Sequence, residues 1–254
     1  LENARLYQES VTRVEQELNI ARRIQSNLFP RSLPQLAGLA LDARCMPARE
    51  TGGDFYDVIA LSGQRVGIIV GDVSGKSIPA AMLMAVARSI TRSEARNHEI
   101  PQLVMCETNR WIVRDVPRRT FVALSYATLD LECRRLALSN AGQLTPLRRR
   151  ADGRIDYLEA PGPRLPLGTM PDIAYDALEV TLDPGDLLVF YTDGIVEAHN
   201  DQHDLFGFER LEALLREYGN LPPAPFIDRL MQAVAAFTGG TAQHDDITLV
   251  VARV

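Results

Sequence analysis

The sequence has few cysteines, almost no lysine and no long apolar run, and these shortages exclude several classes of protein. The cysteines are Cys45, Cys106 and Cys133; none belongs to a Cys-x-x-Cys pair, and an odd number makes no disulfide framework. We therefore expect a reducing, cytoplasmic compartment. No stretch approaches the roughly 18 apolar residues of a membrane span. Because the chain begins at Leu1 and carries no signal peptide, we expect a fragment of a longer protein, which could be membrane-tethered upstream.

Lys76 is the only lysine, so the other basic residues are arginines, and acidic residues outnumber basic ones to give a net charge of −6. A chain with this balance is not expected to bind nucleic acid. Its 254 residues, of which 46% are hydrophobic, are enough to bury a sizeable core. We expect one large domain with an appendage.

The appendage is the N-terminal segment 1–30, in which residues 1 to about 28 are predicted to form a helix that Pro30 and Pro34 end. Its apolar residues recur in steps of four and three, and they are Tyr7, Val11, Val14, Leu18, Ala21 and Leu28. This heptad seam is typical of a coiled coil. We expect a signalling helix that pairs across a homodimer and connects to an upstream sensor domain. The alternative is a helix that packs on its own domain.

Residues 31–254 are predicted to mix strands and helices. Most strands come in pairs joined by short turns such as Ser62-Gly63-Gln64 and Asp183-Pro184-Gly185, which predicts antiparallel sheets. The predicted strands are 39–45, 54–61, 65–70, 121–130, 134–140, 144–149, 155–159, 175–182, 186–191 and 246–254. The predicted helices are 78–96, with Met82, Ala85, Val86 and Ile90 on one face, and 101–113, 207–217 and 223–237. This order favours two antiparallel sheets with helices outside them over a doubly wound parallel fold.

Four aspartates lie far apart in the chain, each at a turn signal: Asp54, Asp72, Asp193 and Asp245. Three of them adjoin an apolar strand-like run. A carboxylate at a strand end beside glycine is poorly placed for packing but well placed to bind a hard cation. Oxygen ligands select Mg²⁺ or Mn²⁺ over zinc, and two such ions can activate a water for attack on a phosphate ester. Asp57 is a weaker candidate, with a surface or strand-edge position as its alternative.

Other phosphate-handling classes fit the sequence less well. Only three residues separate Gly71 from Gly75, whereas a phosphate-binding loop needs four before Gly-Lys-Ser. No cysteine has an arginine six positions later, which excludes a cysteine phosphatase. His199 and His203 are four apart, but they lie in a stretch that is predicted to be a solvated loop rather than a zinc site.

Taken in order, these segments resemble the PPM (type 2C) family of metal-dependent serine/threonine phosphatases, and within it the bacterial branch of SpoIIE-like and RsbU-like enzymes. The resemblance spans about residues 20–254. The segments that carry it are Ala21-Arg22-Arg23-Ile24-Gln25, Leu28-Phe29-Pro30, Gly52-Gly53-Asp54-Phe55-Tyr56-Asp57, Gly71-Asp72-Val73-Ser74-Gly75-Lys76, Asn140-Ala141-Gly142, Pro166-Leu167-Gly168, Tyr191-Thr192-Asp193-Gly194 and Asp245-Asp246-Ile247-Thr248.

The resemblance implies an α+β fold, a four-layer α-β-β-α sandwich with two Mn²⁺ or Mg²⁺ ions between the sheets. Asp72 would bridge the ions, Asp54 would bind one, and Asp193 with Asp245 would complete the other, while the Val73 carbonyl oxygen contributes a backbone ligand. Asp246 is the alternative to Asp245, because neighbouring residues of a strand point to opposite faces. The family often has His where this chain has Gln143, and Thr where it has Ala123. Arg44, Arg49 and Arg164 are candidates for binding the substrate phosphate.

The sequence therefore predicts a phosphatase that removes phosphate from phosphoserine or phosphothreonine of a regulatory protein. The resemblance implies a STAS-domain anti-sigma-factor antagonist as the substrate, and regulation by the upstream sensor through the N-terminal helix. The alternative is a catalytically silent relative that binds a phosphoprotein or serves as a dimerisation module.

Overall fold

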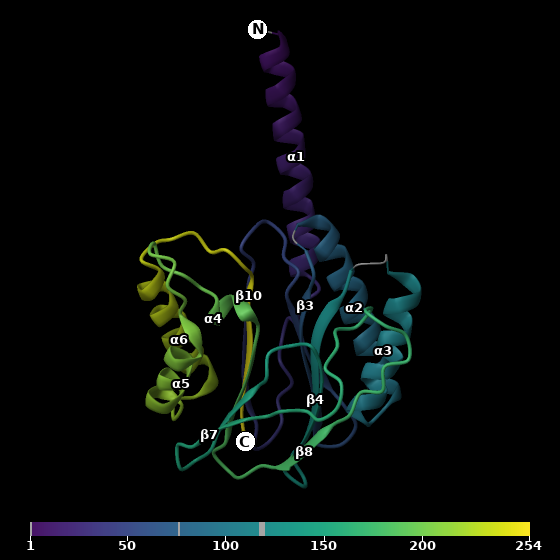
Figure 1. Ribbon diagram of the computed structural model, residues 1–254, viewed down its shortest axis with the longest axis vertical. Helices are drawn as coiled ribbons and strands as arrows, with labels where there is room; N and C mark the ends of the chain where they lie inside the picture. Colours follow the sequence, from purple (N-terminus) through teal and green to yellow (C-terminus); the bar gives the residue numbers. More distant parts are fainter. Residues whose placement is uncertain (1, 76, 117–119) are drawn as a thin grey trace.

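Two antiparallel sheets stacked face to face, with a pair of helices on each outer side, form the body of the chain (Figure 1). The computed structural model describes residues 2–75, 77–116 and 120–254. The helices are α1 (Glu2–Ser26), α2 (Ile78–Asn97), α3 (Pro101–Asp115), α4 (Asp193–Val196), α5 (Gly207–Tyr218) and α6 (Pro223–Thr238). The strands are β1 (Ala40–Met46), β2 (Phe55–Ala60), β3 (Arg65–Val73), β4 (Val122–Asp130), β5 (Arg135–Ala141), β6 (Leu147–Arg149), β7 (Ile155–Tyr157), β8 (Leu178–Thr181), β9 (Leu187–Tyr191) and β10 (Ile247–Arg253).

Each sheet has five strands, in the orders β1-β10-β9-β6-β7 and β2-β3-β4-β5-β8. Apolar side chains of both sheets, among them Ile68, Phe190 and Val250, form the core between them. A second core lies under α2 and α3, and a third under α5 and α6. Apolar residues thus occupy both faces of each sheet, which holds four layers together. The predicted α-β-β-α architecture is confirmed.

The strands on either side of the Asp183-Pro184-Gly185 turn do not pair with each other. β8 pairs with β5 in one sheet, whereas β9 pairs with β10 and β6 in the other. The turn therefore carries the chain from one sheet to the next. Buried Asp186 fixes it, because its carboxylate accepts a hydrogen bond from the Asp183 N–H at 2.8 Å and forms an ion pair with Arg148.

Helix α1 projects away from the layered body, and only its C-terminal end meets the rest of the chain (Figure 1). Along the predicted heptad seam, Tyr7 is 72% and Val14 52% exposed. On neighbouring α2, Met82 and Val86 are also exposed, because the face that packs on the sheet carries Leu83, Met84 and Ala87. Across the described residues, no helix is both long and apolar enough to span a bilayer.

Asp57 lies on β2, which is an edge strand of its sheet. Its side chain is a buried ion-pair partner, so of the alternative positions weighed for it the exposed surface is wrong and the strand edge is confirmed. Its side chain is fully buried, and its Oδ2 lies 2.9 Å from Arg88 and 2.6 Å from Arg92, both on α2. Its Oδ1 accepts a hydrogen bond from the Val58 N–H at 2.9 Å. The carboxylate thus fastens α2 to β2, a few residues after Asp54.

Replacing Asp57 with Ala should lower the free energy of unfolding by about 3 kcal/mol, because it leaves two arginines without their buried partner. Urea unfolding of the purified chain measures this change. Asp115→Ala is the matched control, since Asp115 forms an exposed ion pair with Arg114 and its loss should leave the unfolding midpoint unchanged. Equal midpoints for the two variants would show that the buried ion pairs add no stability.

Candidate metal centre

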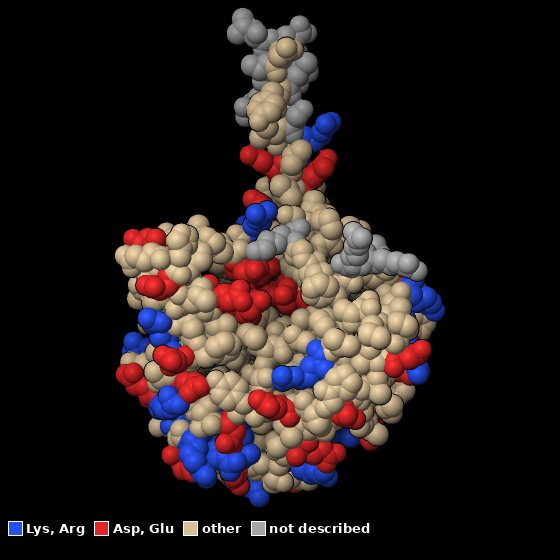
Figure 2. Space-filling model, in the orientation of Figure 1, with Lys and Arg blue, Asp and Glu red and all other residues tan. Residues whose placement is uncertain are grey.

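The aspartates singled out by the sequence lie where strands of the two sheets end. Asp54 precedes β2 and Asp72 is near the end of β3, in one sheet. Asp245 and Asp246 precede β10 of the other sheet, and Asp193 begins α4 directly after β9. Figure 2 shows acidic side chains gathered in a hollow below the base of the projecting N-terminal helix.

These carboxyl groups lie close enough to raise one another's pKa values. Burial, together with the charges of Asp193, Asp245 and Asp246, raises the pKa of Asp72 to about 7. Burial, followed by the charge of Asp72, holds the pKa of Asp54 well above its ordinary value. The pKa of Asp193 is raised by burial and by the charges of Glu197 and Asp245. The structure therefore brings Asp54, Asp72, Asp193 and Asp245 into one group whose negative charges repel one another.

Asp245 and Asp246 have different surroundings. Asp246 is buried, and its carboxylate accepts hydrogen bonds from the backbone N–H groups of Ala48 at 2.8 Å, Gly53 at 2.7 Å and Asp54 at 3.3 Å. Asp245 is half-buried, and its Oδ1 accepts the Asp246 N–H at 3.0 Å. The Asp246 carboxylate thus holds the loop before β2, and its charge also raises the pKa of Asp72. The charge of Asp245 raises the pKa values of both Asp72 and Asp193.

Glycine is required where this loop passes the cluster. A Cβ at Gly52 would overlap the Asp246 carboxylate, and one at Gly194 would overlap the Asp246 carbonyl oxygen. A Cβ at Gly53 would lie 2.7 Å from the Val73 carbonyl oxygen. These contacts leave no room for a side chain, so the glycines of the Gly-Gly-Asp and Asp-Gly motifs allow the backbone to approach the carboxylates closely.

The sequence did not identify three residues of the site as functional candidates. Thr192 Oγ1 donates a hydrogen bond to Asp54 Oδ2 at 2.6 Å, and it accepts one from the Thr248 N–H at 3.0 Å. Thr192 thereby orients Asp54 across the gap between the sheets. Glu197, one turn beyond Asp193, adds a further negative charge. The Tyr-Thr-Asp-Gly motif contains Thr192, so its place beside Asp193 was the available signal.

The third residue is Gln25, on the last turn of α1. Its side-chain amide makes two hydrogen bonds to Gly52: Nε2 donates to the carbonyl oxygen at 2.6 Å, and Oε1 accepts the N–H at 3.1 Å. Gln25 is buried, although most of α1 is exposed. The N-terminal helix is thus joined directly to the loop that carries Asp54. Gln25 stands where the heptad seam skips an apolar residue, and this break was its sequence signal.

The donor types of this group fit a hard divalent cation, since carboxylates and a backbone carbonyl supply only oxygen. A cation would also relieve the repulsion that raises the pKa values of Asp54 and Asp72. Within residues 2–75, 77–116 and 120–254, however, no three acidic, histidine or cysteine side chains already form a group able to hold a metal ion.

The remaining predicted site residues lie in varied surroundings. Arg44 forms an ion pair with Asp228 at 2.9 Å, and Arg164 donates to Thr145 Oγ1 at 3.1 Å, while Arg49 is exposed. Gln143 stabilises its own turn, because its N–H donates to Asn140 Oδ1 at 2.8 Å. Ala123 on β4 pairs with Asp72 in register. Lys76, part of the resemblance, lies outside the described residues.

Solved structures share this fold. The SiaA-PP2C domain of Pseudomonas aeruginosa is 24% identical, with a TM-score of 0.84 over 96% of this chain and 98% of that domain. Two more distant structures were solved with metal ions. RsbX in complex with magnesium is 14% identical, with a TM-score of 0.66 over 87% of this chain and 98% of RsbX. The PstP catalytic domain in complex with two manganese ions is 17% identical, with a TM-score of 0.58 over 85% of this chain and 98% of that domain. At these identities the likeness establishes the fold.

Two curated relatives match nearly the whole chain. Protein IcfG of a Synechocystis species is 29% identical over 92% of this chain and 41% of its own length. Phosphoserine phosphatase RsbU of Bacillus subtilis is 27% identical over 94% of this chain and 70% of its own length. The chain thus spans less than half of IcfG. The family described as Stage II sporulation protein E (SpoIIE) matches residues 62–254, about three quarters of the sequence. This chain belongs to the SpoIIE family, in the RsbU/SpoIIE-like bacterial branch of the PPM phosphatases.

Proposed function

We propose that this chain is a Mn²⁺- or Mg²⁺-dependent phosphatase that hydrolyses phosphoserine or phosphothreonine on a regulatory protein. The convergence of Asp54, Asp72, Asp193 and Asp245 from two sheets is the observation that carries the proposal, because a divalent cation would offset their crowded charges. The metals bound by RsbX and PstP support the choice of ion. RsbU, named as a phosphoserine phosphatase, supports the choice of reaction.

In this proposal two ions are held by Asp54, Asp72, Asp193, Asp245 and the Val73 carbonyl oxygen. When bound, they would lower the pKa of a water that attacks phosphorus and offset the charge of the phosphoryl oxygens. The chain's own task is positioning. Thr192 keeps the Asp54 carboxylate turned toward the centre, and Asp246 holds the backbone of Gly53 and Asp54 in place. We assign Asp246 this supporting role and Asp245 that of ligand.

The substrate and partners are proposed from the relatives. We infer a phosphorylated regulatory protein, with a STAS-domain anti-sigma-factor antagonist as the first choice. Because IcfG and RsbU extend beyond the matched region, an upstream sensor domain is a further part of the proposal. A pull-down with the phosphorylated and unphosphorylated forms of a STAS protein would test this choice, and equal recovery of both would contradict it.

We propose that residues 1–30 are a regulatory helix and that residues 31–254 are the phosphatase domain it controls. Gln25 supports this division, since it joins the end of α1 to Gly52 in the metal loop. The exposed apolar side chains of Tyr7 and Val14 support a homodimer through the same helix. Light scattering measures the mass of the chain in solution, and a monomer at all concentrations would contradict the dimer.

A silent phosphoprotein-binding or dimerisation module is the alternative, and turnover distinguishes it from the enzyme. Purified wild-type chain should hydrolyse p-nitrophenyl phosphate only with Mn²⁺ or Mg²⁺, and Asp193→Ala should reduce the rate at least about a hundredfold by removing a metal ligand. Asp201→Ala, in the exposed loop after α4, is the control and should leave the rate unchanged. Metal-independent turnover, or full activity of Asp193→Ala, would contradict the two-metal proposal.

The raised pKa of Asp72 predicts how pH and metal affect stability. A carboxyl group whose folded pKa, about 7, exceeds its unfolded value destabilises the metal-free fold as pH rises from about 4 to 7. Asp72→Asn should therefore stabilise the metal-free protein at pH 8, on the order of 1 kcal/mol after allowance for solvent screening. Thermal unfolding with EDTA measures this gain, and Mn²⁺ should stabilise only the wild type. A stabilised mutant that still responds to Mn²⁺ would rule out Asp72 as the bridging ligand.

Gln25→Ala should weaken metal-dependent activity, because the loop before Asp54 loses two hydrogen bonds of about 1 kcal/mol each. The Mn²⁺ concentration for half-maximal hydrolysis should rise by up to about thirtyfold, with the rate recovered at saturating Mn²⁺. Gln16→Ala, on the exposed part of α1, is the matched control. Identical Mn²⁺ dependence of the two variants would show that the helix does not position the loop.

A further inference from the structure

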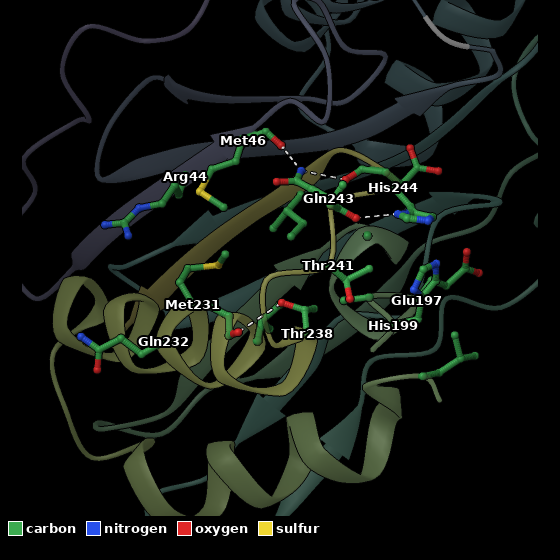
Figure 3. Close-up of a pocket in the computed structure, with 18 of the residues that line it drawn as sticks. Arg44, Met46, Glu197, His199, Met231, Gln232, Thr238, Thr241, Gln243 and His244 are labelled. Atoms are coloured by element: carbon green, nitrogen blue, oxygen red, sulfur yellow. Dashed lines mark hydrogen bonds between the residues drawn. The ribbon is translucent and has the colours of Figure 1, made fainter. Parts of the chain in front are cut away.

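A groove of about 920 Å³ lies beside the carboxylate cluster, between α6 and the segments 194–205 and 238–245. Its middle is apolar, with Met46 on β1 and Met231 on α6 extending into it from opposite sides (Figure 3). Val234 and Ile247 also line it. This volume is in the range of sites that bury a ligand the size of several residues.

The two ends of the groove differ in charge. At one end Arg44 is neutralised by its ion pair with Asp228. At the other lie Glu197, His199 and His244, the two histidine rings with centroids 3.8 Å apart (Figure 3). His199 is half-buried here, whereas only His203 keeps the exposed position predicted for this loop.

The acidic end of the groove continues into the proposed metal centre. Asp245 and Gly194 line the groove, and Gly194 follows Asp193 directly. Glu197, on the groove wall, is close enough to Asp193 to raise its pKa. A phosphoryl group at the centre would therefore leave the adjoining residues of the same polypeptide at the mouth of this groove.

We propose that the groove binds the substrate polypeptide next to its phosphorylated residue and takes one large apolar side chain between Met46 and Met231. This inference rests on the proposed phosphatase function and adds to it a preference for sequence. Methionine side chains adapt their shape to the group they contact, so leucine, methionine or phenylalanine would each fit. An acidic side chain would fit poorly, because the arginine among the described lining residues already has Asp228 as its partner.

Phosphoserine peptides in a Gly/Ser background, each with one leucine at a different position, test the proposal. One leucine position should raise kcat/KM about tenfold over the leucine-free peptide, the gain expected from burying that side chain. Ala235→Trp, which fills the groove from an exposed position on α6, should abolish the gain and leave p-nitrophenyl phosphate hydrolysis unchanged. Ala236→Trp, the next exposed residue of α6 and outside the groove, should retain the gain.

The outcomes distinguish failure of the proposed groove from failure of the proposed phosphatase function. If no leucine position helps, or if Ala235→Trp keeps the preference, the groove does not bind substrate. If the wild type fails to hydrolyse p-nitrophenyl phosphate, the proposed function fails, and fluorescence anisotropy of the labelled peptides with Mn²⁺ still decides the groove by whether leucine tightens binding. A change of mass in light scattering with Ala235→Trp, without loss of the leucine preference, would instead make the groove a contact between two copies and overturn the proposal.

Discussion

Repulsion between carboxylates is the constraint around which the centre of this fold is arranged. Burial and neighbouring charges raise the pKa values of Asp54, Asp72 and Asp193, so the folded chain keeps these groups together at a cost in stability. Hydrogen bonds beside the gap offset this loss of stability. Thr192 donates to the Asp54 carboxylate, and the Asp246 carboxylate accepts the N–H of Gly53, the residue before Asp54. A divalent cation would turn the same repulsion into attraction, which links metal binding to the stability of the fold.

Both the N-terminal helix and a surface groove adjoin this group of carboxylates. Both Asp246 and Gln25 of α1 form hydrogen bonds with the backbone of the loop before β2. A displacement of α1 would break the hydrogen bonds between Gln25 and Gly52, and the loop that carries Asp54 would then be free to move. In the proposed regulation, a movement of this loop would therefore change metal binding. The groove shares Asp245 with the centre, so the proposed substrate and the proposed metal ions would meet at the same edge.

Much of the fold could be predicted from the sequence, because hairpin strands and their turns are local. The same is true of the aspartates, whose glycine neighbours and strand ends are visible in the chain. Contacts between residues of different layers could not be predicted from the sequence. The partners of Asp57 on α2 come more than thirty residues later, and Gln25 binds a backbone amide that has no sequence signature. The strands β8 and β9 flank an ordinary turn signal, yet they belong to different sheets, because β8 pairs with β5 and β9 pairs with β10.

The most direct test of this account is a crystal structure of the chain grown with Mn²⁺, with data collected at the manganese absorption edge. The account predicts two anomalous peaks between the sheets, both contacting Asp72, with Asp54 at one and Asp193 and Asp245 at the other. Peaks absent from this gap, or present only at the surface, would contradict a two-metal centre. A single peak that leaves Asp72 uncoordinated would contradict its role as the bridging ligand.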